Sequence, residues 1–273
     1  MAGGSREPGR TVTARVLSIL AIFEDSLAPR SLTDITAATG IPTSTAHRLI
    51  GELEAWGALQ RDGLGRYQVG MRLWELGQHA GRQVREIARP HLQDLFSLTQ
   101  ETVHIAVRDG MDVLYVDRIY GSRRVPQASR VGGRLPLHAT AVGKAILAFE
   151  DETVRDAVLR EPLERRTSAT HVDPARLTAE LAAIRSLGHA LAVEEVRAGS
   201  ASIAVPLFER DGRVGAALGL VVATADAPRL ERHLPALLGI ARKIEARMGN
   251  VPLASLRSSR TSRGGEPVAP RPN

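Results

Sequence analysis

The chain has 273 residues, and its hydrophobic content of 43% is enough for more than one domain with its own core. It contains no cysteine, which excludes disulfides, thiolate metal sites and a cysteine nucleophile. The net charge of +6 is compatible with nucleic-acid binding, but residues 1–79 hold eight arginines against eight acidic residues, so binding there depends on where the arginines lie.

The first three predicted elements are helices. A scaffold helix runs from about Thr11 to Asp25, with apolar residues at helical spacing along one face. Ser31 caps a second, short helix that continues through Ala38, and Gly40 allows the chain to reverse there. Pro42 then presets the first turn of a third helix. This order predicts a helix-turn-helix.

The third helix, 43–56, has two different faces. One face is apolar and is predicted to be buried: Ala46, Leu49, Ile50, Leu53 and Trp56. The other carries hydroxyls, an imidazole and a guanidinium, which suit contacts with base edges and phosphates: Thr43, Ser44, Thr45, His47 and Arg48. We predict a DNA recognition helix, with the alternative that these residues only cap the helix and solvate its surface.

A hairpin follows this helix. Residues 58–61 are predicted to pair with residues 66–69 across the turn Asp62-Gly63-Leu64-Gly65. Arg61 and Arg66 flank the turn, where a wing lies along the phosphate backbone. Residues 11–70 are therefore predicted to form a winged helix-turn-helix DNA-binding domain.

Residues 71–89 are predicted to be a linker helix, with Pro90 marking its end or a break. Leu73, Trp74 and Leu76 give this helix more apolar surface than one narrow stripe requires. We expect it to connect two domains and to contribute to a dimer. The alternative, that Trp74 packs only within its own chain, remains open.

Residues 90–249 are predicted to mix helices and strands. Residues 102–108 and 112–120 read as a hairpin at the edge of a sheet, and further strands are expected over 190–196, 202–209 and 213–223. A closing helix is expected over 227–247. Together these elements predict an α+β sensor domain with a pocket on one face, and the Ser-, Arg-, Gly- and Pro-rich tail, 250–273, is predicted to be disordered.

Three sequence blocks resemble one protein family. RLPLHATAVGKAILAF (134–149), PTSTAHRLIGELEAWG (42–57) and EEVRAGSASIAVPLFERDG (194–212) together resemble the IclR family of bacterial transcriptional regulators, over nearly the whole of 11–248. The resemblance implies a winged helix-turn-helix, a linker helix and a GAF-like α+β effector-binding domain. It also implies dimers, often paired into tetramers, that bind palindromic operator DNA and respond to a small metabolite, commonly an organic or aromatic acid.

The block at 134–149 also has a physical interpretation. A helix that begins after Thr140 exposes the amides of Ala141 and Val142, which suits a carboxylate. For Gly143 and Lys144 an alternative to a ligand-binding role remains open, which is that they serve only the packing of the helix on the sheet. The resemblance implies an effector site formed by Leu135, Ala141, Val142, Ala192, Ser202, Gly219 and Val221.

This set departs from the pattern of family members that bind small acids. Ala192 lacks an acidic group, while Gly219 and Val221 lack hydroxyls, so only backbone amides and Ser202 are expected as polar anchors. Burying a small charged acid without partners costs several kcal/mol. We therefore expect an effector larger or more apolar than a two- or three-carbon acid, with three residues of the preceding loop as possible polar lids: Arg124, Gln127 and Arg130.

Catalytic motifs are absent from the sequence. His104, His138, His171 and His189 are scattered, and the chain has no nucleophile elbow, metal-ligand spacing or phosphate-binding glycine loop. His138 is expected to bond backbone at the start of the helix. No catalytic residue, metal or cofactor is expected.

The absence of a membrane-length apolar segment and of a signal-peptide core predicts a cytoplasmic protein with no membrane partner. Two alternatives to a ligand-controlled regulator remain. One is a ligand-independent DNA-binding protein whose C-terminal domain only oligomerises, and the other is a metabolic enzyme with an incidental helical corner.

Overall fold

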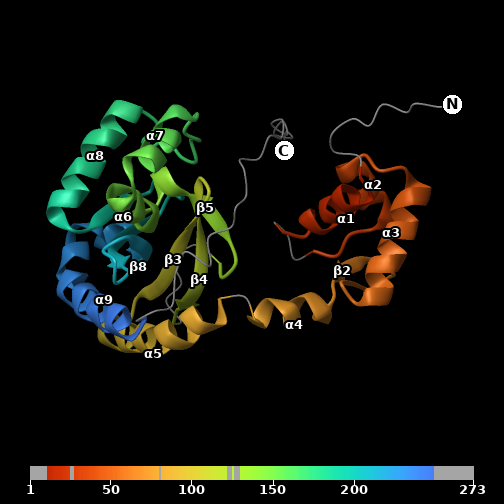
Figure 1. Cartoon of the computed structure of the whole chain (residues 1–273), viewed down its shortest axis with the longest axis horizontal. Helices are drawn as coiled ribbons and strands as arrows, with labels where there is room; N and C mark the ends of the chain where they lie inside the picture. Colours follow the sequence, from red (N-terminus) through yellow and green to blue (C-terminus); the bar gives the residue numbers. More distant parts are fainter. Residues whose placement is uncertain (1–10, 25–27, 80, 122–124, 126–129, 249–273) are drawn as a thin grey trace. The chain divides into compact units, whose positions relative to one another are not determined.

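The computed structural model describes residues 11–24, 28–79, 81–121, 125 and 130–248, and the chain divides into two compact units at residues 80 and 81 (Figure 1). The predicted tail, together with Arg124 and Gln127, lies outside the described residues. In the part that is described, no helix is both long enough and apolar enough to cross a bilayer.

The N-terminal unit packs three helices around one core. These helices are α1 (Val12–Ala21), α2 (Leu32–Thr39) and α3 (Thr43–Trp56). Ser31 and Asp34 form a reciprocal capping box at the start of α2, and Gly40 ends that helix with a φ of 66°. The core between the helices contains the apolar face of α3, with Ile19, Ile35 and Leu59 from other elements. The predicted helix-turn-helix is therefore confirmed.

The predicted hairpin is also present. Strands β1 (Leu59–Arg61) and β2 (Tyr67–Val69) pair antiparallel, with Leu59 opposite Val69. The Asp62 carboxylate accepts hydrogen bonds from the amides of Leu64 and Arg66, both at 2.9 Å, and so shapes the loop at the tip.

Trp56 differs from the prediction. It was expected to be buried, but it is 47% exposed and the Arg72 guanidinium lies 4.8 Å from its ring centroid. The physical reason is its position as the last residue of α3, beyond the packed part of the apolar face. A cation–π contact with Arg72 covers the ring in place of the core.

The predicted linker helix is two helices in the structure. Helix α4 spans Met71–His79, and α5 spans Arg82–Thr99 after Gly81, which has a φ of 64°. Pro90 lies inside α5 and does not end it. The buried face of α5 explains why, since Val84, Ala88, Leu92 and Leu95 all pack into the core of the C-terminal unit, and that packing outweighs one missing hydrogen bond.

The C-terminal unit contains one antiparallel sheet of six strands, in the order β5-β4-β3-β8-β7-β6. The strands are β3 (Thr102–Asp109), β4 (Asp112–Ile119), β5 (Arg134–Pro136), β6 (Ala190–Val193), β7 (Ser200–Phe208) and β8 (Val214–Ala223). The hairpin of β3 and β4 is confirmed, but its predicted place at the edge is wrong. Strand β3 pairs with β8 on its other side, and β5 covers part of β4.

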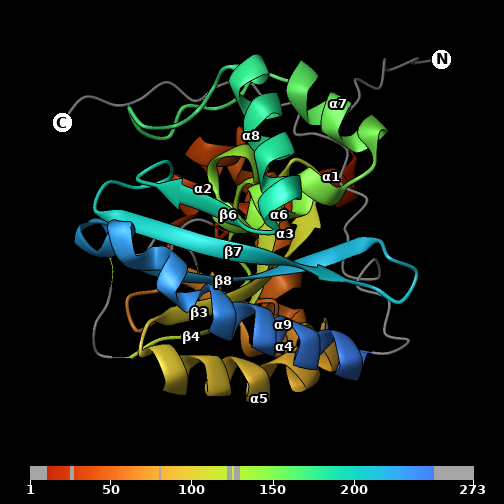
Figure 2. The same cartoon turned by 90° about the vertical axis from the view of Figure 1, so that its left-hand side faces the viewer.

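Helices cover both faces of this sheet (Figure 2). Helices α5 and α9 (Leu234–Met248) pack on one face, and α6 (Ala141–Phe149), α7 (Glu152–Arg160) and α8 (Pro174–Leu187) cover the other. The predicted closing helix begins as a 3-10 helix over Thr224–His233, which contains Pro228, and becomes α-helical only from Leu234. Helices α7 and α8 were not predicted.

Candidate functional site

The outer face of α3 is the first candidate surface. Thr43, Ser44, His47 and Arg48 are exposed, while Thr45 is half-buried. No side chain of the described residues caps the start of α3, so its first amide groups remain available to an acceptor. The alternative that these hydroxyls serve to cap the helix therefore finds no support in the structure.

The arginines near this face are held by weak ion pairs. Arg48 Nη1 lies 2.5 Å from Glu52 Oε1 one turn further along α3, and both side chains are more than half exposed. An exposed pair of this kind contributes only about 0.3–0.5 kcal/mol. A phosphate can therefore replace Glu52 at little cost.

The wing arginines are arranged in the same way. Arg61 Nε bonds Glu54 at 3.0 Å and its guanidinium lies 4.8 Å from the ring centroid of Tyr67, while Arg66 Nε bonds Asp62 at 2.9 Å. Both arginines are exposed and flank the tip of the hairpin, as predicted.

The start of α6 forms one wall of a pocket in the C-terminal unit. Thr140 Oγ1 accepts a hydrogen bond from Gly143 N at 3.0 Å and donates to Pro136 O at 3.2 Å. A Cβ on Gly143 would lie 2.2 Å from Leu137 O, so only glycine permits this close turn. Gly143 therefore permits the close approach of the preceding turn to the start of α6.

The pocket includes six of the seven predicted effector residues, which are Leu135, Ala141, Val142, Ala192, Ser202 and Val221. Gly219 is not among its lining residues. A Cβ at this position would lie 2.8 Å from His104 Nε2 and 2.9 Å from Val142 Cγ1, so Gly219 makes room for two residues that do line the pocket.

The expectation of few polar anchors is wrong. The pocket is also lined by polar residues that sequence reasoning did not place there: His104, Tyr115, Arg118, Thr140, Glu194, Glu195 and Ser200. The alternation along β3 and β4 could have indicated His104 and Tyr115, because both lie on the sheet face that α6 covers. Arg118 lies past the bulge in that hairpin. Beyond a bulge, the alternation of residues along a strand no longer predicts which face of the sheet a side chain is on.

His104 and Tyr115 form the floor of the pocket. Their rings pack edge to face with centroids 5.1 Å apart. Burial, with a smaller contribution from the nearby charge of Arg118, lowers the pKa of His104 to about 3, so the imidazole is neutral at physiological pH. Burial likewise raises the pKa of Tyr115, although Arg118 opposes that shift. His104 Nδ1 has no hydrogen-bond partner among the described residues.

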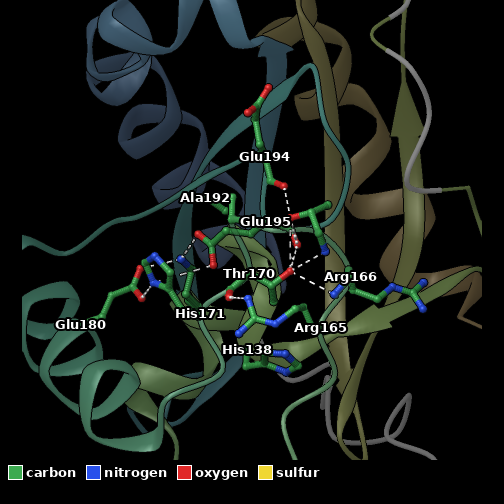
Figure 3. Close-up of polar contacts among 12 residues, drawn as sticks. His138, Arg165, Arg166, Thr170, His171, Glu180, Ala192, Glu194 and Glu195 are labelled. Atoms are coloured by element: carbon green, nitrogen blue, oxygen red, sulfur yellow. Dashed lines mark hydrogen bonds and ion pairs between the residues drawn. The ribbon is translucent and has the colours of Figure 1, made fainter.

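The other histidines have varied surroundings. His138 Nε2 lies 3.0 Å from Glu164 O, which is the backbone contact expected for it. His189 lies near Glu231, 3.3 Å from its Oε1. His171 contacts Glu180 and approaches Glu195 (Figure 3). Both glutamates also form ion pairs with the buried Lys144.

Comparisons with known proteins match both units. A family model described as "Bacterial transcriptional regulator IclR C-terminal" matches residues 79–246, and the "IclR helix-turn-helix domain" matches residues 12–63. The chain is 34% identical over 215 residues to the HTH-type transcriptional regulator XynR of Escherichia coli, covering 77% of this chain and 85% of the relative. It is 31% identical to the transcriptional repressor AllR of Escherichia coli, covering 80% of this chain and 83% of that repressor.

Solved structures agree with these matches. An IclR homologue from Microbacterium hydrocarbonoxydans, crystallised as a complex with 4-hydroxybenzoate, superposes with a TM-score of 0.80 at 33% identity, covering 87% of this chain and 99% of that chain. The Thermotoga maritima IclR structure gives a TM-score of 0.72 at 30% identity, covering 87% and 98%. The chain therefore belongs to the IclR family of transcriptional regulators, with a helix-turn-helix DNA-binding domain and a C-terminal effector-binding domain.

Proposed function

We propose that the protein binds palindromic operator DNA as a dimer, or as a pair of dimers, and that an organic acid with an aromatic or apolar body controls this binding. The observation that carries the effector assignment is the pocket between α6 and the sheet. Anion-binding groups, apolar walls and an imidazole nitrogen with no hydrogen-bond partner among the described residues occur together there.

The DNA-binding part of the proposal rests on α3 and the wing. Short hydroxyl side chains and Arg48 at the start of α3 suit base edges in the major groove, and Arg61 and Arg66 suit the phosphates beside it. A two-fold dimer engages two half-sites about 34 Å apart, or a multiple of that distance.

Self-association is supported by apolar side chains left on the surface of the N-terminal unit. They are large, and each is more than half exposed: Val12, Leu17, Met71, Trp74 and Leu76. Exposed apolar surface of this extent is typical of a protein interface. We infer that α1 and α4 contribute to the dimer.

The effector assignment follows from the chemistry of the pocket. The uncovered amides of Ala141 and Val142 at the start of α6, together with the Arg118 guanidinium, suit a carboxylate. His104 Nδ1, on the strand position opposite Arg118, suits a further polar group of the ligand such as a hydroxyl, and Leu135, Val142 and Val221 suit its apolar body. The complex of the related Microbacterium protein with 4-hydroxybenzoate supports an acid of this kind.

A calorimetric titration tests the proposal. The full-length protein is titrated with benzoate, hydroxybenzoates, pyruvate and glyoxylate, and we expect an aromatic acid to bind more tightly than the two- and three-carbon acids. Ser202→Ala should weaken that binding about fivefold, because a hydrogen bond contributes roughly 1 kcal/mol. Ser186→Ala, which removes an exposed hydroxyl on α8, is the matched control and should leave the affinity unchanged.

Two results contradict the effector assignment. Tight binding of glyoxylate or pyruvate that is lost in Ser202→Ala shows that the pocket takes small acids. A protein that binds DNA specifically but shows no heat and no shift in melting temperature with any acid supports the alternative in which the C-terminal domain only oligomerises.

A further inference from the structure

We propose that His171, Glu180 and Glu195 form a binding site for a divalent transition-metal ion of the zinc class, beside the proposed effector pocket. The three residues come from different segments, because His171 precedes α8, Glu180 lies within α8 and Glu195 follows β6. The spacing of these residues in the sequence does not predict a metal site. The fold brings them together.

The ligand atoms have nearly the spacing that a metal ion requires. One ligand atom from each residue can be chosen so that all three lie within 4.8 Å of one another. His171 Nδ1 is 2.9 Å from Glu180 Oε2 and 4.0 Å from Glu195 Oε2. A tetrahedral ion with bonds of about 2.0–2.2 Å holds its ligand atoms roughly 3.4 Å apart, so the two distances to His171 need changes of about half an ångström.

Lys144 orients the two carboxylates. Its Nζ lies 2.5 Å from Glu180 Oε1 and 2.6 Å from Glu195 Oε1, and its side chain is completely buried. Because the lysine engages one oxygen of each glutamate, the other oxygen of each is directed toward His171 (Figure 3). Outer hydrogen bonds of this kind hold metal ligands in place in known metal sites.

A second observation points to a missing ligand. Glu195 Oε2 is buried and has no hydrogen-bond partner among the described residues, and the Glu195 side chain is only 4% exposed. A buried carboxylate oxygen without a protein partner costs free energy, because no protein donor replaces the hydrogen bonds that it makes in bulk water. A cation bound between Glu195 Oε2 and His171 Nδ1 removes this cost.

The local charges favour a cation. Two carboxyl groups lie against one ammonium, that of Lys144, and a divalent ion adds the positive charge that a second carboxylate requires. His171 is partly exposed and also lines a surface pocket with Thr170, Asp173 and Arg176, which gives an ion a path to the site. One imidazole and two carboxylates leave a fourth position for water.

The proposed site shares one residue with the effector pocket, because Glu195 lines both. An ion that fixes Glu195 also fixes one wall of that pocket. We therefore infer that the effector domain responds to a metal ion as well as to its effector. The site itself rests only on the cluster, so its test requires no effector.

Cobalt is the probe for the test. The full-length protein is treated with a chelator, dialysed and titrated with Co²⁺, and the visible absorption of the ion is recorded. We expect visible bands of a four-coordinate Co²⁺ ion that saturate at one ion per chain, and we expect one equivalent of Zn²⁺ to abolish them. Mg²⁺ should not compete, because it prefers six oxygen ligands.

Variants show whether the cluster holds the ion. His171→Ala removes a proposed ligand and should weaken Co²⁺ binding by more than the 10- to 100-fold that the loss of an outer partner typically causes. His79→Ala removes an exposed histidine of α4 and should bind like the unsubstituted protein. A second variant, Glu180→Gln, should also lose the bands, and circular dichroism checks that each variant is folded.

The proposal is overturned if the unsubstituted protein shows no saturable visible bands. It is also overturned if folded His171→Ala keeps the same bands and the same affinity, since the ion then binds elsewhere. Loss of the bands in His79→Ala but not in His171→Ala assigns the ion to the surface histidine.

Discussion

His104 lies on β3 inside the sheet, where an ionisable side chain has little contact with water. Burial and Arg118 lower its pKa to about 3, whereas an unfolded chain has a histidine pKa of about 6.5. Between these two values the unfolded state binds a proton that the folded state does not. The free energy of unfolding is therefore expected to fall as the pH falls from about 6.5 toward 3.

Replacing His104 makes this effect measurable. In urea denaturation, we predict that the unsubstituted protein loses about 2 kcal/mol more stability than His104→Gln between pH 7.5 and pH 5, because one group contributes up to about 1.4 kcal/mol per pH unit. His79→Ala, on the surface of α4, should lose as much stability over this pH range as the unsubstituted protein does. Equal losses in His104→Gln and the unsubstituted protein contradict the buried neutral imidazole.

The residues of the pocket show what the sequence can indicate. Ala141, Val142 and Ser202 line the pocket, and the start of a helix and a recognised motif were enough to locate them; their contact with an effector stays a prediction. His104 and Arg118 were not placed, because their position depends on which strand lies under α6 and on the bulge in β3 and β4. Contacts between segments that are far apart in the chain leave no local pattern in the sequence from which they could be predicted.

Helix α3 is the element on which DNA binding is proposed to depend, and Arg48 provides its test. Arg48→Ala should weaken specific DNA binding about tenfold or more, since one base or phosphate contact contributes about 1–3 kcal/mol. The melting temperature should stay nearly constant, because the exposed pair with Glu52 stabilises the fold very little. Fluorescence anisotropy with a labelled duplex measures the affinity.

The chain offers a matched control for this variant. Arg160 on α7 forms an exposed pair with Asp156 one turn away, as Arg48 does with Glu52. Arg160→Ala removes the same charge from the C-terminal unit and should leave DNA affinity close to that of the unsubstituted protein. Equal affinities for Arg48→Ala and Arg160→Ala contradict a contact between Arg48 and DNA.

Elements with local signals were predicted well, and elements set by packing were not. In the N-terminal unit, local signals predicted the ends of helices and strands to within a few residues. These signals are the cap at Ser31, the left-handed Gly40 and the turn after Arg61. Pro90 was expected to end or break a helix, yet α5 continues through it because a long apolar face packs on the sheet. At Pro228 the predicted α-helix is not formed: this proline lies in a 3-10 segment, and the α-helix α9 begins only after that segment.

In the molecule as a whole, the N-terminal unit carries the exposed face of α3 and the C-terminal unit carries the pocket proposed to bind the effector. An effector can change DNA binding only if it binds one arrangement of the dimer more tightly than another. Such coupling has to pass through the segment that contains α4 and α5. The family resemblance predicted this division of roles, whereas composition alone permitted an enzyme.

Selection of duplexes from a random DNA pool by the full-length protein tests the central claim most directly, because it requires no knowledge of the natural operator. We predict enrichment of an inverted repeat whose half-sites lie one helical turn, or a multiple of it, apart, and loss of that enrichment in Arg48→Ala. The affinity for the enriched duplex should fall steeply with salt. A pool that remains random, or an enriched sequence bound equally well by Arg48→Ala, contradicts the account.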